Sequence, residues 1–333
     1  MTSRRIVLGA GLAALAAACS PRAEKSAPGS ARIRFATDWR AQAEHGGFYQ
    51  ALATGEYRKR GLDVSIVQGG PGVNVPQLLA TGAVEMGMGS NSFIVLNLVA
   101  GDEPVPVKAV AAFMQKDPQV LLAHPGQGIK SIADMKDRPI LLAAASREAF
   151  WVWLRARYGF QDSQIRSYNY SAAPFLADKR AVQQGYVSSE PYTIEKEAGF
   201  KPEVFLLADE GYPSYATMAL ASDKLISRNP EAVESFIAAS AAGWKSYLNG
   251  DPSAADALIL KDNPDMTPDL LANGRAMMKQ YGIVESGDAE TLGIGAMTDQ
   301  RWADFFKVAS DQGVYPKDLD YRKAYTLQFV KQA

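Results

Sequence analysis

The chain has 333 residues, of which 47% are hydrophobic and 21% charged, so it is long and apolar enough for a globular protein of about two domains. Its 35 lysines and arginines balance 36 aspartates and glutamates, which excludes the basic surface that nucleic-acid binding needs. The single cysteine, Cys19, excludes an intramolecular disulfide, and the two histidines, His45 and His124, exclude a multi-histidine metal cluster. We therefore expect no metal and no cofactor, although a carboxylate-only ion site stays open.

Residues 1–19 have the layout of a secretory signal, because an Arg-Arg pair precedes an apolar run that ends at Ala18. This run is shorter than the roughly 20 residues that span a bilayer as a helix. It closes in Ala-Ala-Ala-Cys, which resembles a bacterial lipobox, with Leu15 one position further from the cysteine than usual. We expect Cys19 to be lipidated and to anchor the protein to a bacterial membrane in the periplasm. A soluble periplasmic protein, cleaved after the alanines, is the alternative.

The Arg4-Arg5 pair also resembles a twin-arginine export signal, and both export routes stay open. Residues 20–31 are rich in proline, serine, alanine and glycine and have no apolar period. Such a composition predicts a flexible tether. The folded protein is expected to start at about Arg32.

The first part of the mature chain alternates short apolar runs with longer amphipathic ones, which is typical of an α/β protein. The alternation predicts strands at 33–37, 62–67, 84–88, 107–113 and 120–123. The helices predicted between them lie at 47–60, 75–80 and 93–99. The first of these helices stops at Gly61, a residue that tolerates the conformation of a helix C-terminus.

A second unit begins near the Pro-Gly-Gln-Gly turn at 125–128. Its predicted strands are 139–144, 165–170, 185–188 and 204–207. Its predicted helices are 131–135, 147–158 and 174–181. Ser146 stands where the N-cap of the second of these helices would be.

After a further strand at 215–222 the sequence becomes helical. Asn229-Pro230 is a helix opening, and the predicted helices are 231–248, 252–261, 268–281 and 300–312. The pattern predicts two α/β lobes between which the chain crosses twice. Lobe 1 is expected to comprise 32–123 and 214–333, with the C-terminal helices packed on it, and lobe 2 to comprise 124–213. A ligand cleft between the lobes would be lined by strand ends and helix N-termini.

Several segments carry a family resemblance: 37–49, 51–64, 77–87 (QLLATGAVEMG) and 185–191 (GYVSSEP). Together they resemble the periplasmic binding proteins related to the fungal thiamine-pyrimidine synthase, a superfamily that also contains sulfonate, taurine and nitrate binding proteins. The resemblance extends from residue 32 to about 250. It implies a type II periplasmic binding fold and a monomeric substrate-binding lipoprotein that serves the permease and ATPase of an ABC importer.

The same superfamily contains the synthase itself, so an enzyme is the alternative of another class. Laying the synthase along this chain places its Schiff-base lysine at Gly89 and its donor histidine at Phe93. Glycine has no amine and phenylalanine no nitrogen, and the region of the cysteine-rich motif, 210–215, contains no cysteine. The resemblance therefore favours a binding protein over an enzyme. A sensor domain that signals to a membrane partner is a third hypothesis.

Four candidate ligand contacts lie at the end of the first strand and in the helix after it. Asp38 can accept hydrogen bonds from a ring amine, and the indole of Trp39 can stack on a planar heterocycle. His45 precedes Gly46-Gly47 at a helix start, where an imidazole and free backbone N–H groups can bind a polar ligand. Tyr49, one turn later, can stack or use its hydroxyl. A turn cap or a core position is the structural alternative for each.

Three further candidates follow the next strands of lobe 1. Gly70, in a Gly-Gly-Pro-Gly loop, lets the backbone approach a ligand closely, although a tight turn explains it equally. Ser90 and Asn91 open a helix after a strand and offer a hydroxyl and an amide to a carbonyl or an anion.

The second lobe and the second crossing supply the remaining candidates. Ser146 at a helix start can face the cleft from lobe 2, and Glu190, just after a strand, can accept charge-assisted hydrogen bonds from a ligand amine. Tyr215 near the second crossing can close over a ring. By contrast, the aromatic stretch 150–153 is expected to be core and lobe surface, and the helically spaced aromatics of 302–306 are expected to pack the last helix in place.

These residue types favour a thiamin pyrimidine precursor, of the hydroxymethylpyrimidine or formylaminopyrimidine type, as the ligand. An indole, an imidazole and two carboxylates suit a flat ring with amine donors, whereas a sulfonate, taurine or nitrate would need cationic donors. Arg40 and Arg147 lie nearby in the sequence, and riboflavin is also compatible with stacking, so both alternatives stay open.

Overall fold

The computed structural model of the chain describes residues 30–101 and 103–330. The expected signal, the lipidation of Cys19 and all but the last residues of the tether lie outside these residues. In the described part no helix is both long and apolar enough to cross a membrane.

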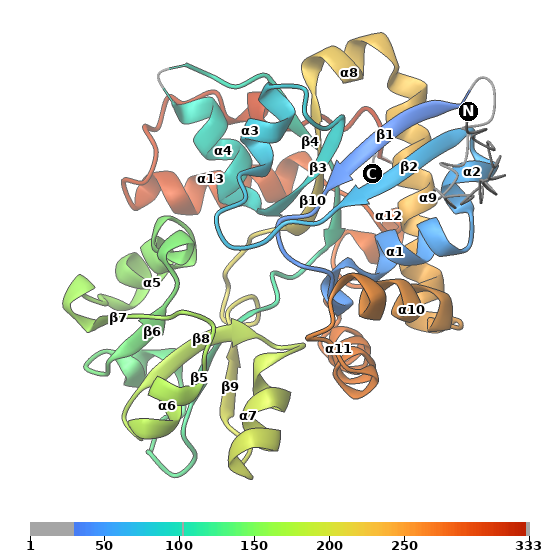
Figure 1. Ribbon diagram of the computed structural model, residues 1–333. Coiled ribbons are helices and arrows are strands. Elements are labelled where there is room, and N and C mark those ends of the chain that lie inside the picture. The colour runs from blue at the N-terminus through green and yellow to red at the C-terminus, as the bar shows by residue number, and fades with distance from the viewer. Residues whose placement is uncertain (1–29, 102, 331–333) are drawn as a thin grey trace, which may run out of the picture.

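The first lobe of the described chain is built on a five-stranded mixed sheet in the order β2-β1-β3-β10-β4 (Figure 1). β1 pairs in parallel with β2 and β3, and β10 runs antiparallel between β3 and β4. Its strands are β1 (Ala31–Ala36), β2 (Leu62–Val67), β3 (Met86–Asn91), β4 (Val107–Met114) and β10 (Ala216–Ser222).

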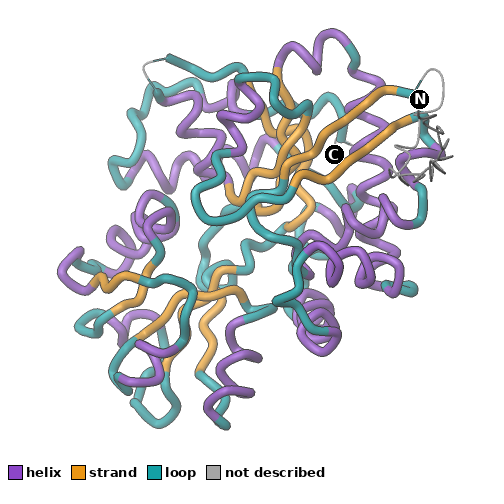
Figure 2. The backbone as a smooth tube through the Cα atoms, viewed as in Figure 1, coloured by secondary structure: helices purple, strands orange, loops and turns teal. Residues whose placement is uncertain are grey.

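The second lobe repeats this plan with a sheet in the order β7-β6-β8-β5-β9 within the described residues. β6 pairs in parallel with β7 and β8, and β5 runs antiparallel to β8 and β9. Its strands are β5 (Gln119–Ala123), β6 (Ile140–Leu142), β7 (Ile165–Ser167), β8 (Val182–Tyr186) and β9 (Glu203–Leu206). Figure 2 shows the two sheets as separate groups of strands.

The described chain passes between the two sheets twice, at 115–118 and at 207–215. The first crossing therefore comes earlier than the lobe boundary expected after residue 123. The physical reason is the pairing of β5, whose predicted strand is correct but whose hydrogen bonds go to β8 and β9. An apolar strand such as 120–123 fits the middle of either sheet, and only its partners decide which lobe it joins.

The helices in the N-terminal half of lobe 1 connect its strands. The helix expected at 47–60 is interrupted at Gly55, which has a positive φ of 74° and separates two helices. The helices of this half are α1 (Gly46–Ala53), α2 (Glu56–Lys59), α3 (Val75–Ala80) and α4 (Ser92–Ala100).

The helices of lobe 2 are α5 (Phe150–Tyr158), α6 (Ala173–Ala177) and α7 (Glu190–Ala198), the last of which the sequence pattern did not predict. The prediction of Ser146 as an N-cap is wrong. Ser146 lies within a 3-10 turn, η3 (Ala144–Glu148), and α5 begins only at Phe150. Because Ala149 precedes α5, no side chain caps its N-terminus.

The C-terminal helices return to lobe 1, as expected, and run from golden yellow through orange to red in Figure 1. They are α8 (Asp223–Arg228), α9 (Pro230–Asn249), α10 (Ser253–Asp262), α11 (Pro268–Gln280), α12 (Ala289–Leu292) and α13 (Asp299–Asp311). The expected N-cap is confirmed, since the Asn229 side chain accepts from Ala232 N. The aromatic side chains of 150–153 and 302–306 are buried: Phe150, Trp151, Trp153, Trp302, Phe305 and Phe306.

Two glycines, Gly47 and Gly243, bring α1 and α9 into close contact. A Cβ on Gly243 would lie 2.2 Å from the carbonyl oxygen of Gly47, and a Cβ on Gly47 would lie 2.2 Å from the ring of Trp244. Gly46 and Gly47 are therefore needed for packing, and their buried position contradicts the expectation that they present backbone N–H groups to a ligand.

We expect Gly243→Ala to destabilise the protein by about 1–3 kcal/mol, because the added methyl forces the two helices apart. The sign of the change in unfolding free energy is informative, because replacing glycine with alanine at an unobstructed helix position would stabilise the protein by about 1 kcal/mol. Urea unfolding of Gly243→Ala and of Gly70→Ala, where a Cβ meets nothing within 4 Å, checks this. Equal stability of the two variants would contradict the close helix contact.

Candidate functional site

A cavity of about 410 Å³ lies between the two lobes. Its lobe-1 wall consists of residues that follow β1 and β2 and of residues in and after β3, and much of its lobe-2 wall lies at or after the ends of β6, β7 and β8. These are the carboxyl ends of the parallel strands in both sheets, the edge at which open α/β sheets bind ligands. The volume lies in the range of roughly 300–1,000 Å³ that small-molecule sites occupy.

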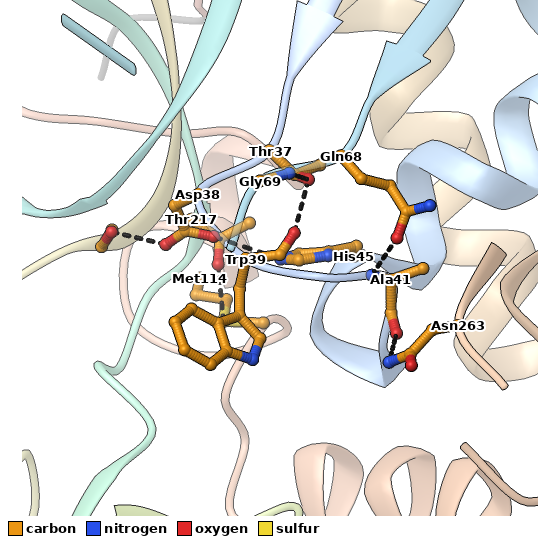
Figure 3. A network of polar contacts seen from close by, with 11 residues as sticks. Thr37, Asp38, Trp39, Ala41, His45, Gln68, Gly69, Met114, Thr217 and Asn263 are labelled. Atoms are coloured by element: carbon orange, nitrogen blue, oxygen red, sulfur yellow. Dashed lines mark hydrogen bonds and ion pairs between the residues drawn. The ribbon is translucent and has the colours of Figure 1, made fainter. Parts of the chain in front are cut away.

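The loop after β1 is held rigidly by its neighbours. The Thr37 hydroxyl donates to the carbonyl oxygen of Trp39 at 2.7 Å and accepts from the backbone N–H of Gly69 at 3.2 Å (Figure 3). A Cβ at Gly69 would lie only 2.3 Å from the carbonyl oxygen of Thr37, so glycine is required where the loops after β1 and β2 meet.

The far end of the same loop is fixed by two amide side chains. Ala41 donates its N–H to Gln68 Oε1 at 2.9 Å and accepts from Asn263 Nδ2 at 2.8 Å, just beyond α10. With both ends held, the loop directs Asp38 and Trp39 to the cavity. In Figure 3 the indole of Trp39 projects away from this polar network.

Asp38 is a fixed acceptor at the floor of the cavity. Its Oδ1 lies 3.2 Å from His45 Nε2, and its Oδ2 accepts from the Ser90 hydroxyl at 2.5 Å. A carboxylate has about four lone-pair sites, so these two contacts orient the group and leave acceptor capacity for a ligand.

Asn91 completes the lobe-1 wall. Its side-chain oxygen accepts from the N–H of Phe93 at 3.1 Å and caps α4. This contact leaves the amide nitrogen of Asn91 available to the cavity, which it lines together with the ring of Phe93.

Glu190 is the corresponding acceptor on lobe 2. Its Oε2 accepts from the N–H of Tyr186 at 2.7 Å and from the Ser189 hydroxyl at 2.5 Å. The carboxylate fits there because Gly185 has no side chain: a Cβ at that position would lie 2.8 Å from the Cβ of Glu190. The strand end of β8 and the first residue of α7 thus position one carboxylate between them.

A third carboxylate links the lobes. The hydroxyl of Ser188, in lobe 2, donates to Glu44 Oε1 from the turn before α1. The carbonyl oxygen of Ser188 also accepts from Asn273 Nδ2 of α11 at 3.2 Å. Burial raises the pKa of Glu44 above its ordinary value, and the hydrogen bond from Ser188 opposes that rise.

The cavity is acidic. Its wall contains the carboxylates Asp38, Glu44, Glu148 and Glu190, and among the described residues that line it there is no lysine, arginine or histidine. The pKa of the Tyr186 hydroxyl is raised, first by burial and then by carboxylates that include Asp38 and Glu190. Such a site favours ligands that donate hydrogen bonds or carry positive charge.

The structure places seven of the ten predicted site residues on the cavity: Asp38, Trp39, Gly70, Ser90, Asn91, Ser146 and Glu190. It corrects the expectation for the other three. His45 is fully buried and contacts the site only through Asp38. The Tyr49 hydroxyl donates to Asp262 at 3.0 Å, and that of Tyr215 donates to Asp288 at 2.5 Å, so both tyrosines belong to the core of lobe 1.

Several cavity residues were not predicted from the sequence. They include Glu44, Tyr168, Tyr170, Gln184 and Tyr186. Tyr168 and Tyr170 follow β7, and Tyr186 ends β8. These three tyrosines could have been identified from their positions near strand ends. The predicted strands at 165–170 and 185–188 included them, so they were treated as strand residues and not as ligand contacts.

Two α/β lobes, two crossings and a cavity at the carboxyl ends of both sheets define the class of two-lobed periplasmic binding proteins. A solved structure of this class, the aliphatic sulphonate binding protein SsuA from Escherichia coli, matches with a TM-score of 0.65 at 16% identity, covering 91% of this chain and 95% of that one. The chain belongs to the NMT1/THI5-like family, whose sequence profile matches residues 42–255.

Two curated relatives match over most of the chain. A riboflavin-binding protein, RibY, from Chloroflexus aurantiacus is 25% identical over 327 residues, 96% of this chain and 90% of the relative. A formylaminopyrimidine-binding protein from Halalkalibacterium halodurans is 22% identical over 228 residues, 67% of this chain and 68% of the relative. A shorter match, 27% identity over 109 residues or 33% of this chain and 31% of the relative, is to 4-amino-5-hydroxymethyl-2-methylpyrimidine phosphate synthase of Schizosaccharomyces pombe.

Proposed function

We propose that this protein is the substrate-binding component of an ABC importer and captures a planar heterocycle that carries amine donors. The observation that supports this most directly is the set of four acidic side chains on a cavity that also has aromatic lining residues and no basic side chain among its described lining residues. The ligand would bridge the two lobes and stabilise their closed arrangement, a hinge motion without a covalent step.

An aminopyrimidine of the thiamin-precursor type fits this chemistry. A flat ring stacks on the indole of Trp39, and the exocyclic amine donates hydrogen bonds to Asp38 or Glu190, as does the ring nitrogen when it is protonated. The two carboxylates come from opposite lobes, so a ligand that reaches both couples binding to closure. The similarity to a formylaminopyrimidine-binding protein supports this choice.

A sulfonate, taurine or nitrate fits less well, although a sulfonate-binding protein shares the fold. Burying an anion requires cationic or N–H donors to replace its hydration. Arg40, which the sequence left as a possible donor, pairs instead with Asp265 at 3.0 Å, and both side chains are exposed. Arg147 is exposed and is not among the residues that line the cavity.

Riboflavin is the second candidate. A cavity of about 410 Å³ leaves space around a single pyrimidine ring, whereas a tricyclic ring with a polyol chain would occupy more of it. Hydroxyl groups of such a chain are also donors for carboxylates. Similarity to a riboflavin-binding protein along nearly the whole chain supports this alternative.

Pyrimidine synthesis is not proposed for this chain. Gly89 lies in β3 beside Leu220, and an added Cβ would come within 3.0 Å of that side chain, so β3 has little space for a lysine there. Phe93 packs edge-on against Phe305 at a centroid distance of 4.9 Å. We therefore propose a binding protein that is not an enzyme.

We further propose that the protein works as a monomer in the periplasm, anchored by a lipid on Cys19, and delivers its ligand to a permease and ATPase. Metabolic labelling with a fatty acid, in the full chain and in Cys19→Ser, tests the anchor. Label that persists in the variant would contradict it.

Thermal melting of residues 30–333 against a ligand panel tests the proposed function. We expect a shift with hydroxymethylpyrimidine or formylaminopyrimidine, because a ligand at 100 times its Kd adds about 2.7 kcal/mol, enough to raise Tm by several degrees. Riboflavin, taurine, an alkanesulfonate and nitrate complete the panel. A shift with riboflavin alone would select the second candidate, and a shift with a sulfonate alone would overturn the role given to the carboxylates.

A further inference from the structure

Tyr170 has a backbone conformation that tyrosine rarely adopts. Its φ is 64°, and among the described residues Thr217 is the only other non-glycine residue with positive φ. The left-handed region is unfavourable for residues with a Cβ and persists only where surrounding contacts stabilise it. Residues with such strained backbones are concentrated at functional sites. The contacts of Tyr170 therefore indicate which function the strained conformation serves.

Those contacts cross the cleft. Tyr170 follows β7 in lobe 2, and its ring lies 4.6 Å from the ring of Trp39, which follows β1 in lobe 1, with 45° between the planes. Tyr168 supports it from behind at 5.3 Å. The left-handed backbone thus holds an aromatic ring out from its own lobe and against the residue on which we propose the ligand stacks.

The ring also lies at the mouth of the cavity. Tyr170 lines the cavity, yet it is 52% exposed, the highest value among the large hydrophobic side chains described as exposed. Val73, 41% exposed, lines the cavity from the loop after β2. A side chain that lines the cavity and is also half exposed can close the entrance without filling the interior.

We propose that Tyr170 retains the ligand: with Trp39 it closes the cavity mouth over a bound heterocycle, and its left-handed backbone holds the ring in that place. This inference rests on the proposed function. It predicts that loss of the ring accelerates ligand release more than it changes the rate of ligand entry.

The position of the ring can be tested without a ligand. Of the five tryptophans, Trp151, Trp153, Trp244 and Trp302 are at most 2% exposed, so acrylamide quenching of fluorescence reports mainly on Trp39. Tyr170→Ala should raise the quenching constant at least twofold, and Tyr170→Phe, which keeps the ring, should restore it. Tyr192→Ala, on α7 and away from the cavity, is the matched control. An unchanged constant in Tyr170→Ala would overturn the proposal.

Stopped-flow fluorescence with hydroxymethylpyrimidine as the probe tests retention. Tyr170→Ala should release it at least tenfold faster than the unaltered protein, with Tyr170→Phe restoring slow release. Tyr170→Gly should release as fast as Tyr170→Ala but melt at a higher temperature, because glycine adopts the left-handed backbone freely. Equal release from all variants would overturn this inference alone, whereas failure of the unaltered protein to bind hydroxymethylpyrimidine would instead contradict the proposed function on which it rests.

Discussion

Asp38→Asn and Glu190→Gln should each weaken ligand binding about 30- to 1,000-fold, which corresponds to roughly 2–4 kcal/mol. Each substitution replaces a charged acceptor with an amide of nearly the same shape. A ligand amine at that place loses a charge-assisted hydrogen bond and meets a second donor. Isothermal titration with the ligand that the melting panel identifies measures the loss.

These substitutions preserve the contacts that fold the site. In Glu190→Gln the remaining oxygen can still accept from Tyr186 N and the Ser189 hydroxyl, as Oε2 does now. Asp38→Asn keeps one oxygen as the acceptor for one of its two partners, the Ser90 hydroxyl and His45, and its amide N–H can donate to the other. Glu197→Gln, on the exposed face of α7, removes the same charge far from the cavity and should bind normally. Full affinity in both cavity variants would remove Asp38 and Glu190 from the site.

Asp117→Asn should stabilise the protein above pH 7 and have little effect near pH 4. Asp117 lies in the first crossing, is 2% exposed, and accepts from the N–H of Gln119 at 3.1 Å. Burial raises the pKa of this carboxyl to about 7. The ionised group also lies near the buried hydroxyls of Tyr186 and Tyr212, whose pKa values it helps to raise.

The sign of the effect follows from proton linkage. Between about pH 4 and pH 7 the folded protein keeps a proton on Asp117 that the unfolded chain has released, so the free energy of unfolding falls as pH rises through this window. The loss is complete above the folded pKa and is at most about 4 kcal/mol, at 1.36 kcal/mol per unit. Asparagine is neutral throughout and keeps the oxygen that accepts from Gln119, so the variant escapes the loss.

Melting curves of the unaltered protein and Asp117→Asn from pH 4.5 to 8.5 measure this difference. The two curves should nearly coincide at the acid end and separate by several degrees at the alkaline end. Asp137→Asn, at an exposed position, controls for the general effect of one carboxylate. A constant difference across the pH range would show that Asp117 does not titrate within it.

Most of the secondary structure follows from local sequence patterns, because each pattern encodes its own element. The strand at 62–67 and the helix at 75–80 have the predicted bounds, since an alternating run and an Asn74 cap followed by an apolar period are complete within a few residues. The same patterns placed Asp38, Trp39, Ser90 and Glu190 at strand ends, and the family resemblance added the expectation of a cleft there.

Which residues of these segments face the cavity depends on long-range packing, which local patterns do not encode. His45 and Tyr49 both follow Asp38 closely in sequence, yet both are buried. The Tyr49 hydroxyl donates to Asp262 of α10, which is 213 residues distant in sequence. Glu44 is brought to the cavity by its contact with Ser188 of the other lobe, and β5 joined lobe 2 through its pairing with β8 and β9. The role proposed for Tyr170 depends on its contact with the ring of Trp39 across the cleft. The hydrophobic period and the composition of a segment determine whether it forms a helix or a strand. Which of its side chains reach a ligand depends on the distant segments that pack against it.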